Sequence, residues 1–213
     1  MAQAKTESQD LNRQQQRTAA SRDALLDGAR RVLREHGYNQ ASVRLITRAA
    51  RRSHGTFYIH FKNKEAIYAT LLEEMRHRLH RDSRAAWRAE DPLASVRRSI
   101  EIYVRSFQRD REFWGLLDGS SATSSLFQRE RLALRRALVS DIRKGIEKSR
   151  TARLGDMDPD LVAEILAAML EQTCATFLLN GGAVEPDTIT AHITELWGRV
   201  LGYANPDDQS VAD

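Results

Sequence analysis

The chain has 213 residues, 41% of them hydrophobic and 29% charged, which is enough apolar material for one sizeable core or two small ones. Its single cysteine, Cys174, excludes an intramolecular disulfide and is typical of a reducing compartment. Long runs rich in Ala, Leu, Arg and Glu, with four prolines and no sustained alternation of apolar and polar residues, predict an all-α fold of about nine helices.

The net charge of +4 is unevenly distributed along the chain. Residues 1–64 carry 13 Lys and Arg against 5 Asp and Glu, a net +8, whereas residues 65–213 carry 20 against 24, a net −4. This asymmetry indicates an N-terminal part that meets a polyanion; the alternative is a merely solvated basic surface.

The N-terminus, MAQAKTESQD, has no apolar core of a signal peptide. The most apolar run, residues 161–179, is interrupted by Glu164, Glu171 and Gln172, so we expect a buried helix and no membrane partner. These features together predict a cytoplasmic protein.

The first 75 residues show a succession of helix start and stop signals. Residues 1–20 are polar and Gln-rich and are expected to form a flexible basic arm. Ser21 is predicted to cap a first helix that Gly37 ends, and Ser42 and Ser53 are predicted to cap two short helices joined by a three-residue turn. A fourth helix is expected to start at Asn63 and to run toward residue 90.

Two short helices joined by such a turn form a helix-turn-helix, whose second helix enters the DNA major groove. This second helix, near residues 54–60, is too short to be stable alone, so Phe57 and Phe61 are predicted to anchor it on the first helix. The outer surface is then left to His54, Thr56, Tyr58 and His60.

The segment LLDGARRVLREHGYNQASVRLITRAARRSHGTFYIHFKNKEAIYATL resembles the DNA-binding domain of the TetR family of bacterial transcriptional regulators. The resemblance lies in the joint occurrence of the ASV helix start, the GTFYIHF recognition helix and the KNKEAI start of the fourth helix, over about residues 22–75. It implies a homodimer with a C-terminal helical domain that binds and senses a small molecule.

One residue departs from the family pattern. The turn usually contains Gly, but here it reads ARRS and places Arg51 at that position. If Arg51 keeps a positive φ, the side chain costs roughly 1 kcal/mol, which a phosphate contact would offset; otherwise the turn has another geometry.

The predicted DNA contacts combine hydroxyl groups, cations and a glycine that allows close approach to phosphates and base edges. The family counterpart of Arg44 reads bases, and an Arg at this place can bridge guanine O6 and N7. Lys64 stands at a helix N-terminus, which suits phosphate. The full predicted set is Ser42, Arg44, Arg51, Arg52, Ser53, His54, Gly55, Thr56, Tyr58, His60, Lys62 and Lys64.

Five further helices are expected after the fourth. Asp91–Pro92 starts the fifth, Gly119 breaks a short sixth, and residues 124–150 form a seventh. The eighth starts at Asp158–Pro159 and closes at residues 181–182, and a ninth follows near residues 186–203. We therefore expect an arm (1–20), a helix-turn-helix domain (21–75), an effector-binding and dimerisation domain (76–205) and a flexible tail (206–213).

Large apolar side chains of the C-terminal domain fit either simple core packing or the wall of a cavity for a mostly apolar effector. Arg105, Arg129 and Arg131 could pair with an acidic group on that effector or be solvated. The candidate effector-binding residues are Tyr103, Phe107, Phe113, Trp114, Leu117, Phe127, Met169, Cys174 and Phe177.

The last two long helices carry more apolar residues than one inward stripe needs, which predicts a four-helix contact across a two-fold axis. The candidate dimerisation residues are Leu161, Ile165, Leu166, Ile189, Ile193, Leu196, Trp197 and Val200.

We therefore predict a homodimeric repressor that is released from a palindromic operator in double-stranded DNA by a small molecule. An activator or a ligand-independent regulator is the alternative, and a helical enzyme using Cys174 or a helical interaction module is more distant. No His-plus-acid constellation accompanies Cys174, and the P-loop, dinucleotide, H-E-x-x-H and G-x-S-x-G motifs are missing from the sequence. No catalytic residue, metal or cofactor is predicted.

Overall fold

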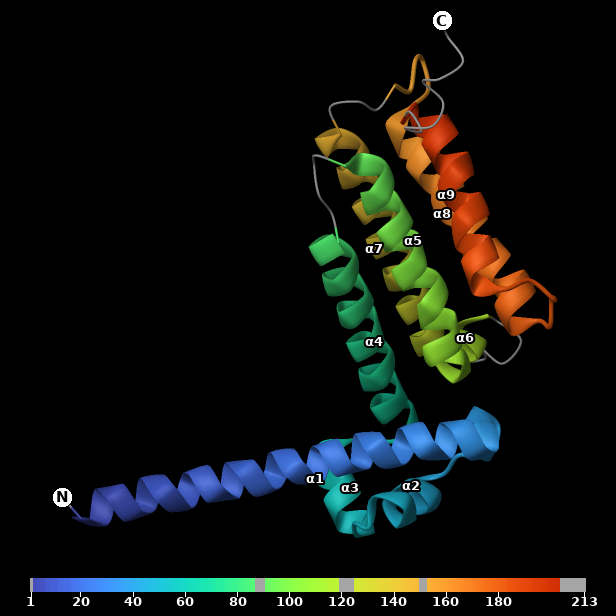
Figure 1. Ribbon diagram of the computed structural model, residues 1–213. Coiled ribbons are helices and arrows are strands. Elements are labelled where there is room, and N and C mark those ends of the chain that lie inside the picture. The colour runs from blue at the N-terminus through green and yellow to red at the C-terminus, as the bar shows by residue number, and fades with distance from the viewer. Residues whose placement is uncertain (1, 87–90, 119–124, 150–152, 204–213) are drawn as a thin grey trace, which may run out of the picture. The chain divides into compact units, whose positions relative to one another are not determined.

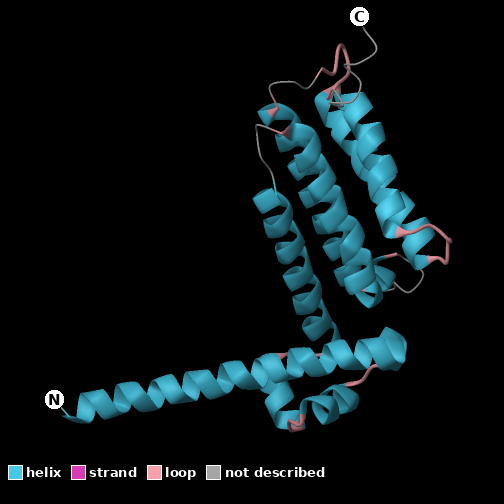
Figure 2. Cartoon of the chain, in the orientation of Figure 1, coloured by secondary structure: helices cyan, strands magenta, loops and turns pink. Residues whose placement is uncertain are grey.

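A computed structural model gives the structure of the chain and describes residues 2–86, 91–118, 125–149 and 153–203, with the backbone alone for residues 2–12 (Figure 1). Across these ranges the chain forms nine α-helices, one π-helical segment and no strand, which confirms the predicted all-α fold (Figure 2). The elements are α1 Ala2–Gln40, α2 Val43–Ala50, α3 His54–His60, α4 Lys64–Ala86, α5 Pro92–Arg109, α6 Arg111–Leu117, α7 Ser125–Lys148, α8 Pro159–Cys174, η1 Ala175–Leu179 and α9 Pro186–Leu201.

The chain divides into two compact units, an N-terminal unit, Met1–Leu72, and a C-terminal unit, Glu73–Asp213. Helix α4 belongs to both, because residues 64–72 lie in the first unit and residues 73–86 in the second. The predicted domain boundary at residue 75 falls inside this helix, and the predicted boundaries at residues 20 and 205 stay predictions.

The core of the N-terminal unit forms where α1 packs against α2 and α3. Gly28 permits the approach of α1 to α2, since a Cβ atom there would lie 2.9 Å from the Ile46 carbonyl oxygen and 3.0 Å from Ala50 Cβ. The Tyr68 hydroxyl of α4 donates to the Ala29 carbonyl at 3.2 Å and ties the fourth helix to the first. The buried apolar residues of this core include Leu25, Leu26, Ala29, Val32, Leu33, Ile46, Phe57, Phe61, Ile67, Tyr68 and Leu71, which confirms Phe57 and Phe61 as anchors.

The local signals that delimit the short helices are confirmed. Ser42 Oγ accepts from the Leu45 amide at 3.3 Å, and Ser53 Oγ accepts from the Thr56 amide at 3.1 Å. Asn63 Oδ1 accepts from the Ala66 amide at 2.9 Å, where α4 begins. Each side chain satisfies an amide that the first helical turn leaves without a backbone partner.

The predicted start of the first helix at Ser21 is wrong, because α1 begins at Ala2. The Gln- and Ala-rich run before Ser21 has high helix propensity, so the helix extends through it and leaves no amide for Ser21 to cap. Gly37 interrupts the helical geometry as predicted, with φ of +69°, although helical hydrogen bonding continues to Gln40.

In the C-terminal unit, α5 packs against α9 and α8, and α7 packs against α8 and α6. Asp91 and Asp158 cap α5 and α8, each followed by a proline at the first helical position, as predicted. The helical run closes before residues 181–182, as predicted, but it changes type on the way: α8 ends at Cys174 and continues as η1 to Leu179. The Arg111 guanidinium then donates to the carbonyls of Leu178 and Leu179, at 2.6 and 2.8 Å. The predicted break at Gly119 lies outside the described residues.

Candidate nucleic-acid interface and ligand cavity

The turn of the helix-turn-helix is closed by a left-handed residue that is not glycine. Arg51 has φ of 53° and ψ of 47°, and within the described ranges it alone among non-glycine residues has a positive φ. Its amide donates to the Arg48 carbonyl at 3.2 Å, and the Arg52 amide donates to the Thr47 carbonyl at 2.9 Å. These two bonds form a Schellman motif, which normally takes Gly at the left-handed position. Of the two geometries left open for this turn, the structure has the left-handed one, in which a residue other than glycine is strained.

Helix α3 buries one side and presents the other to solvent. Phe57 and Phe61 are buried, whereas Tyr58 is 59% exposed and Ile59 is 76% exposed. His54 and Gly55 are exposed and Thr56 and His60 are half-buried, with the Thr56 and Ser53 hydroxyls 2.9 Å apart. Ile59 was missed by the sequence analysis, although its place two residues after Phe57 on a helix already puts it on the opposite side. An exposed isoleucine on a recognition helix suits apolar contact with a thymine methyl group.

The segment from residue 36 to residue 64 contains six Lys and Arg residues and no Asp or Glu. Arg44, Arg51, Arg52 and Lys62 are exposed, so most of these cations face solvent. Such a surface attracts phosphates along its whole length, because no carboxylate within the segment competes for the cations.

Lys64 is half-buried and is already engaged by another helix. Its Nζ donates to the Tyr38 carbonyl at 2.9 Å and lies 4.2 Å from the centre of the Tyr38 ring. Partial burial lowers the pKa of Lys64 below its usual value. Lys64 thus secures the start of α4 to the end of α1, and a phosphate contact uses only its remaining N–H groups.

The C-terminal unit contains a cavity of about 260 Å³ whose wall is built from α4, α5, α7, α8 and α9. Most of the wall is apolar, and the residues include Leu79, Val96, Ile100, Leu134, Leu138, Ile142, Leu170, Trp197 and Leu201. Its volume lies just below the range of ordinary small-molecule sites. The cavity is therefore a candidate effector site.

A histidine and a carboxylate meet at the cavity wall. His80 Nδ1 of α4 lies 2.6 Å from Asp141 Oδ2 of α7, and both residues line the cavity. Burial raises the pKa of Asp141 above its usual value, against the opposing effect of His80. This pair was not predictable from the sequence, because its members are 61 residues apart and neither belongs to a motif.

Of the nine candidate effector-binding residues, Tyr103 alone belongs to the wall of this cavity. Phe107 and Trp114 stack with ring centres 3.9 Å apart, and Phe113, Leu117, Phe127 and Cys174 are also buried. Met169 is half-buried, and Phe177 is partly exposed. Phe107 and Trp114 thus pack on each other and on Tyr103, whose ring centre lies 5.7 Å from that of Phe107 and 5.3 Å from that of Trp114.

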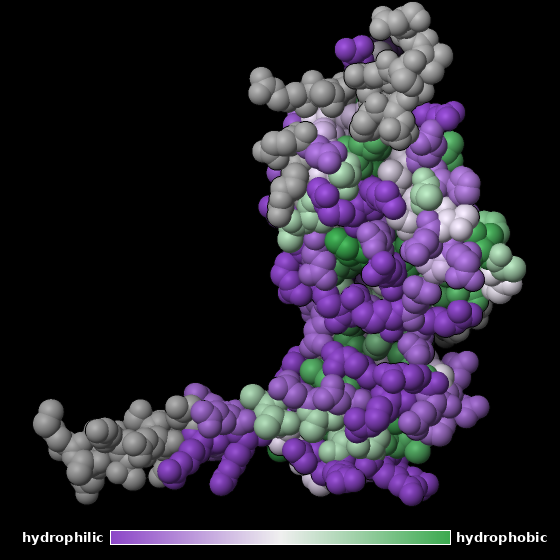
Figure 3. Space-filling model, in the orientation of Figure 1, coloured by the Kyte–Doolittle hydropathy of each residue, from purple (hydrophilic) through white to green (hydrophobic). Residues whose placement is uncertain are grey.

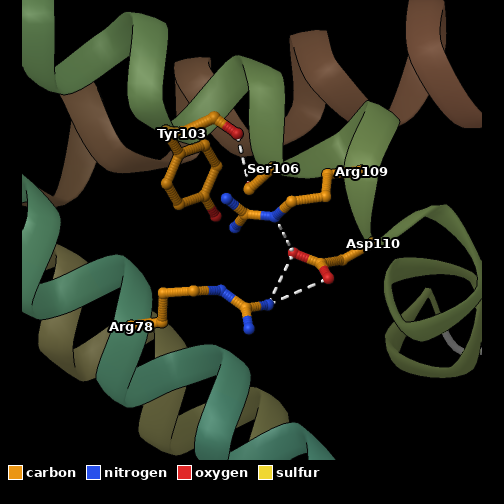
Figure 4. A network of polar contacts seen from close by, with 5 residues as sticks. All are labelled: Arg78, Tyr103, Ser106, Arg109 and Asp110. Carbon is orange, nitrogen blue, oxygen red and sulfur yellow. Dashed lines mark hydrogen bonds and ion pairs between the residues drawn. The ribbon is translucent and has the colours of Figure 1, made fainter. Parts of the chain in front are cut away.

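A buried carboxylate ties α4 to the corner between α5 and α6. Arg78 Nη2 donates to both oxygens of Asp110, at 3.0 and 3.1 Å, and Arg109 Nε donates to the same carboxylate at 2.9 Å (Figure 4). Asp110 is only 8% exposed, so the two guanidinium groups compensate a charge that has lost most of its water.

The outer side of α8 and α9 exposes large apolar residues. Leu161 and Ile165 are 60% and 57% exposed, and Leu196 and Val200 are also exposed. Residues 159–179 have the length and composition of a membrane span, but 39% of their most apolar 18-residue stretch is buried inside the protein. The predicted burial of this segment therefore holds for one side only. On the face shown in Figure 3 most of the surface is hydrophilic, and hydrophobic residues gather near the η1 end.

The other four candidate dimerisation residues, Leu166, Ile189, Ile193 and Trp197, are buried inside the unit. Burial within one copy leaves these four side chains little surface for a partner, so the predicted dimer contact rests on the four exposed residues. The hydrophobic stripes of α8 and α9 are wide enough to serve the core on one side and solvent on the other, and composition does not separate the two sides.

Comparison with known proteins agrees with this architecture. Residues 25–71 match the family model described as bacterial regulatory proteins, tetR family. The HTH-type transcriptional repressor DhaR of Mycobacterium sp. (strain GP1) is 30% identical over 154 residues, 69% of this chain and 77% of DhaR. A TetR-family regulator from Rhodococcus sp. matches in fold, with a TM-score of 0.70, 17% identity and coverage of 86% and 99%. FadR from Bacillus subtilis in complex with stearoyl-CoA also matches in fold, with a TM-score of 0.65, 18% identity and coverage of 85% and 98%.

The strain at Arg51 predicts that Arg51→Gly preserves or raises the melting temperature. Glycine removes a left-handed penalty of about 1 kcal/mol, which at least balances its greater entropy in the unfolded chain. Arg52→Gly is the matched control: Arg52 has no positive φ, so this variant relieves no strain, loses the exposed hydrogen bond from Arg52 to the Arg51 carbonyl, and melts lower. Equal losses of melting temperature in the two variants would contradict a strained turn.

Proposed function

Because the chain belongs to the TetR family of bacterial transcriptional regulators, we propose that it acts as a homodimeric repressor in the cytoplasm. It binds a palindromic operator through α3 and leaves the operator when a small, mostly apolar molecule occupies the cavity of the C-terminal unit. The observation that carries the proposal is the cation-rich segment 36–64, free of carboxylates, around a recognition helix whose outer side is exposed.

In the proposed complex, α3 lies in the major groove and its exposed side chains meet base edges. Tyr58 and Thr56 supply hydroxyl groups, and Ile59 supplies an apolar contact. Arg44, at the start of α2, reaches a guanine or a phosphate, while Arg51, Arg52 and Lys62 hold the backbone. In this complex the strained Schellman turn holds the Arg51 cation close to the DNA backbone. Strained residues cluster at functional sites, which supports a role of Arg51 in DNA contact.

Dimerisation is supported by the exposed apolar face of Leu161, Ile165, Leu196 and Val200. In the proposed dimer, α8 and α9 pack against α8 and α9 of a second subunit around a two-fold axis. This arrangement removes the apolar face from water and makes every contact twice. The two recognition helices then meet half-sites about one helical turn of DNA apart, or a multiple of it.

Effector release is supported by the continuity of α4. Residues 76, 79, 80, 83 and 84 of this helix line the cavity, and its start packs in the core of the N-terminal unit. A ligand that displaces the cavity side of α4 strains the Arg78–Asp110 contact and carries the displacement to the recognition helix. The stearoyl-CoA complex of B. subtilis FadR supports an effector with an apolar part.

The geometry does not support the enzyme alternative. Cys174 is fully buried, and burial raises the pKa of its thiol to about 12. A buried thiol of this kind stays protonated at neutral pH and is a poor nucleophile.

DNA recognition by α3 predicts that Tyr58→Ala lowers the affinity for the selected operator about tenfold, because it removes contacts made only in the groove. Lys62→Ala weakens all duplexes about equally and reduces the salt slope by about one unit. Purified protein is first used to select operator fragments, and binding is then measured over a range of salt concentrations. Arg105→Ala, an exposed cation on α5, is the matched control and keeps both values. Unchanged affinity in folded Tyr58→Ala and Lys62→Ala would reject this interface.

The dimer face predicts that Ile165→Glu raises the dissociation constant of the dimer at least about a hundredfold. The change places a charge against an apolar partner twice per dimer, and a buried isoleucine contributes about 1.5–3 kcal/mol each time. Sedimentation at micromolar concentration measures the effect. Ile59→Glu is the control, since Ile59 is an exposed isoleucine on α3 and is not part of this face. A monomeric wild type, or equal effects of both variants, would contradict the proposed interface.

A further inference from the structure

Several buried polar atoms at the cavity wall have a hydrogen to donate and no hydrogen-bond partner among the described residues. They include the Tyr103 hydroxyl, the Trp197 indole nitrogen and Arg76 Nε. Tyr103 and Trp197 are 2% and 4% exposed, so water does not freely replace the missing partners. Unpaired buried donors are costly, and a ligand that brings an acceptor oxygen relieves that cost.

The charged groups of the wall are predominantly basic. Arg76, His80, Arg84, Lys144 and Lys148 line the cavity, whereas Asp141 is the one carboxylate among the residues that line it. Asp141 is already bound to His80 at 2.6 Å, and Arg84, Lys144 and Lys148 are exposed, which places them at the mouth. The mouth therefore favours an anion.

The inner part of the wall favours an uncharged acceptor over a second anion. Burial is the main reason that the pKa of Tyr103 lies well above its usual value, and the nearby Glu171 carboxylate adds to the effect. The hydroxyl thus remains a neutral donor. A ketone or similar oxygen pairs with Tyr103 without bringing a charge into a poorly solvated site.

The volume limits the size of the ligand. A cavity of about 150 Å³ accommodates benzene, with six heavy atoms, so a cavity of about 260 Å³ accommodates roughly ten. A chain of about eight carbons fits, and a long acyl chain does not fit without enlarging the cavity.

Resting on the proposed function, we propose that the effector is a small amphipathic carboxylate of about eight carbons with a second, uncharged acceptor oxygen. Its carboxylate lies among Arg84, Lys144 and Lys148, its chain lies along Leu79, Ile100 and Leu138, and its inner oxygen accepts from the Tyr103 hydroxyl.

The test measures binding of four probes to the full-length protein by calorimetry: octanoate, 7-oxooctanoate, octan-2-one and stearate. We expect octanoate to bind about tenfold more tightly than octan-2-one, which lacks the charge. We expect 7-oxooctanoate to bind about fivefold more tightly than octanoate, the gain typical of one additional hydrogen bond. Octan-2-one binding as tightly as octanoate, or stearate binding as tightly as octanoate, would overturn the proposal.

Variants assign each gain to its residue. Tyr103→Phe should abolish the advantage of 7-oxooctanoate and leave octanoate unchanged, which also shows that the cavity is intact. The double variant Arg84→Gln, Lys144→Gln should weaken both acids and spare octan-2-one, whereas Arg105→Gln, outside the wall, changes neither. An advantage of the keto group that survives in Tyr103→Phe would contradict the assignment.

Release of operator DNA is measured separately with the same probes. Binding of 7-oxooctanoate without DNA release supports the ligand class and contradicts the proposed release mechanism. Release by another molecule, with none of these probes bound, contradicts the ligand class and supports the release mechanism.

Discussion

Helix α4 is one continuous helix whose residues pack in the cores of both units. At its start, Ile67 and Tyr68 are fully buried in the N-terminal unit, where Tyr68 bonds to α1. Further along, Arg78 is bound to the buried Asp110, and His80 faces the cavity. The proposed effect of a ligand on DNA binding uses this helix, because packed interiors yield little when a shared element is displaced. The proposed control of DNA binding follows from this shared helix and needs no separate moving part.

The helix-turn-helix was predictable because its signals are local. Ser42 and Ser53 cap the short helices, and the four-residue spacing of Phe57 and Phe61 fixes the buried side of α3. The conformation of Arg51 stayed open at that stage, because a residue other than glycine gives no direct sign of a positive φ. The start of α1 was missed, because a polar run with high helix propensity resembles a flexible arm when composition alone is considered.

The cavity and the outer face of α8 and α9 are formed by residues that are distant in the chain. Their residues were therefore predicted less completely than those of the helix-turn-helix. The sequence supplied the aromatic residues of the C-terminal unit but not their partners, so the Phe107–Trp114 stack looked like cavity lining. His80 and Asp141 meet only after α4 and α7 are packed. On α8, Ile165 and Leu166 are neighbours in sequence and equally apolar, yet one is exposed and the other buried. Only the direction of packing decides between them.

We propose that the operator and the cavity ligand oppose each other's binding through α4. The reciprocity of binding free energies gives the most direct test. The measurement is the affinity of 7-oxooctanoate for the dimer, free and saturated with operator. If the ligand lowers operator affinity a hundredfold, a coupling of about 2.7 kcal/mol, the operator must lower ligand affinity by the same factor. We therefore expect 7-oxooctanoate to bind the DNA-saturated dimer more weakly than the free dimer, by that same factor. Equal ligand affinity in the two states would contradict it.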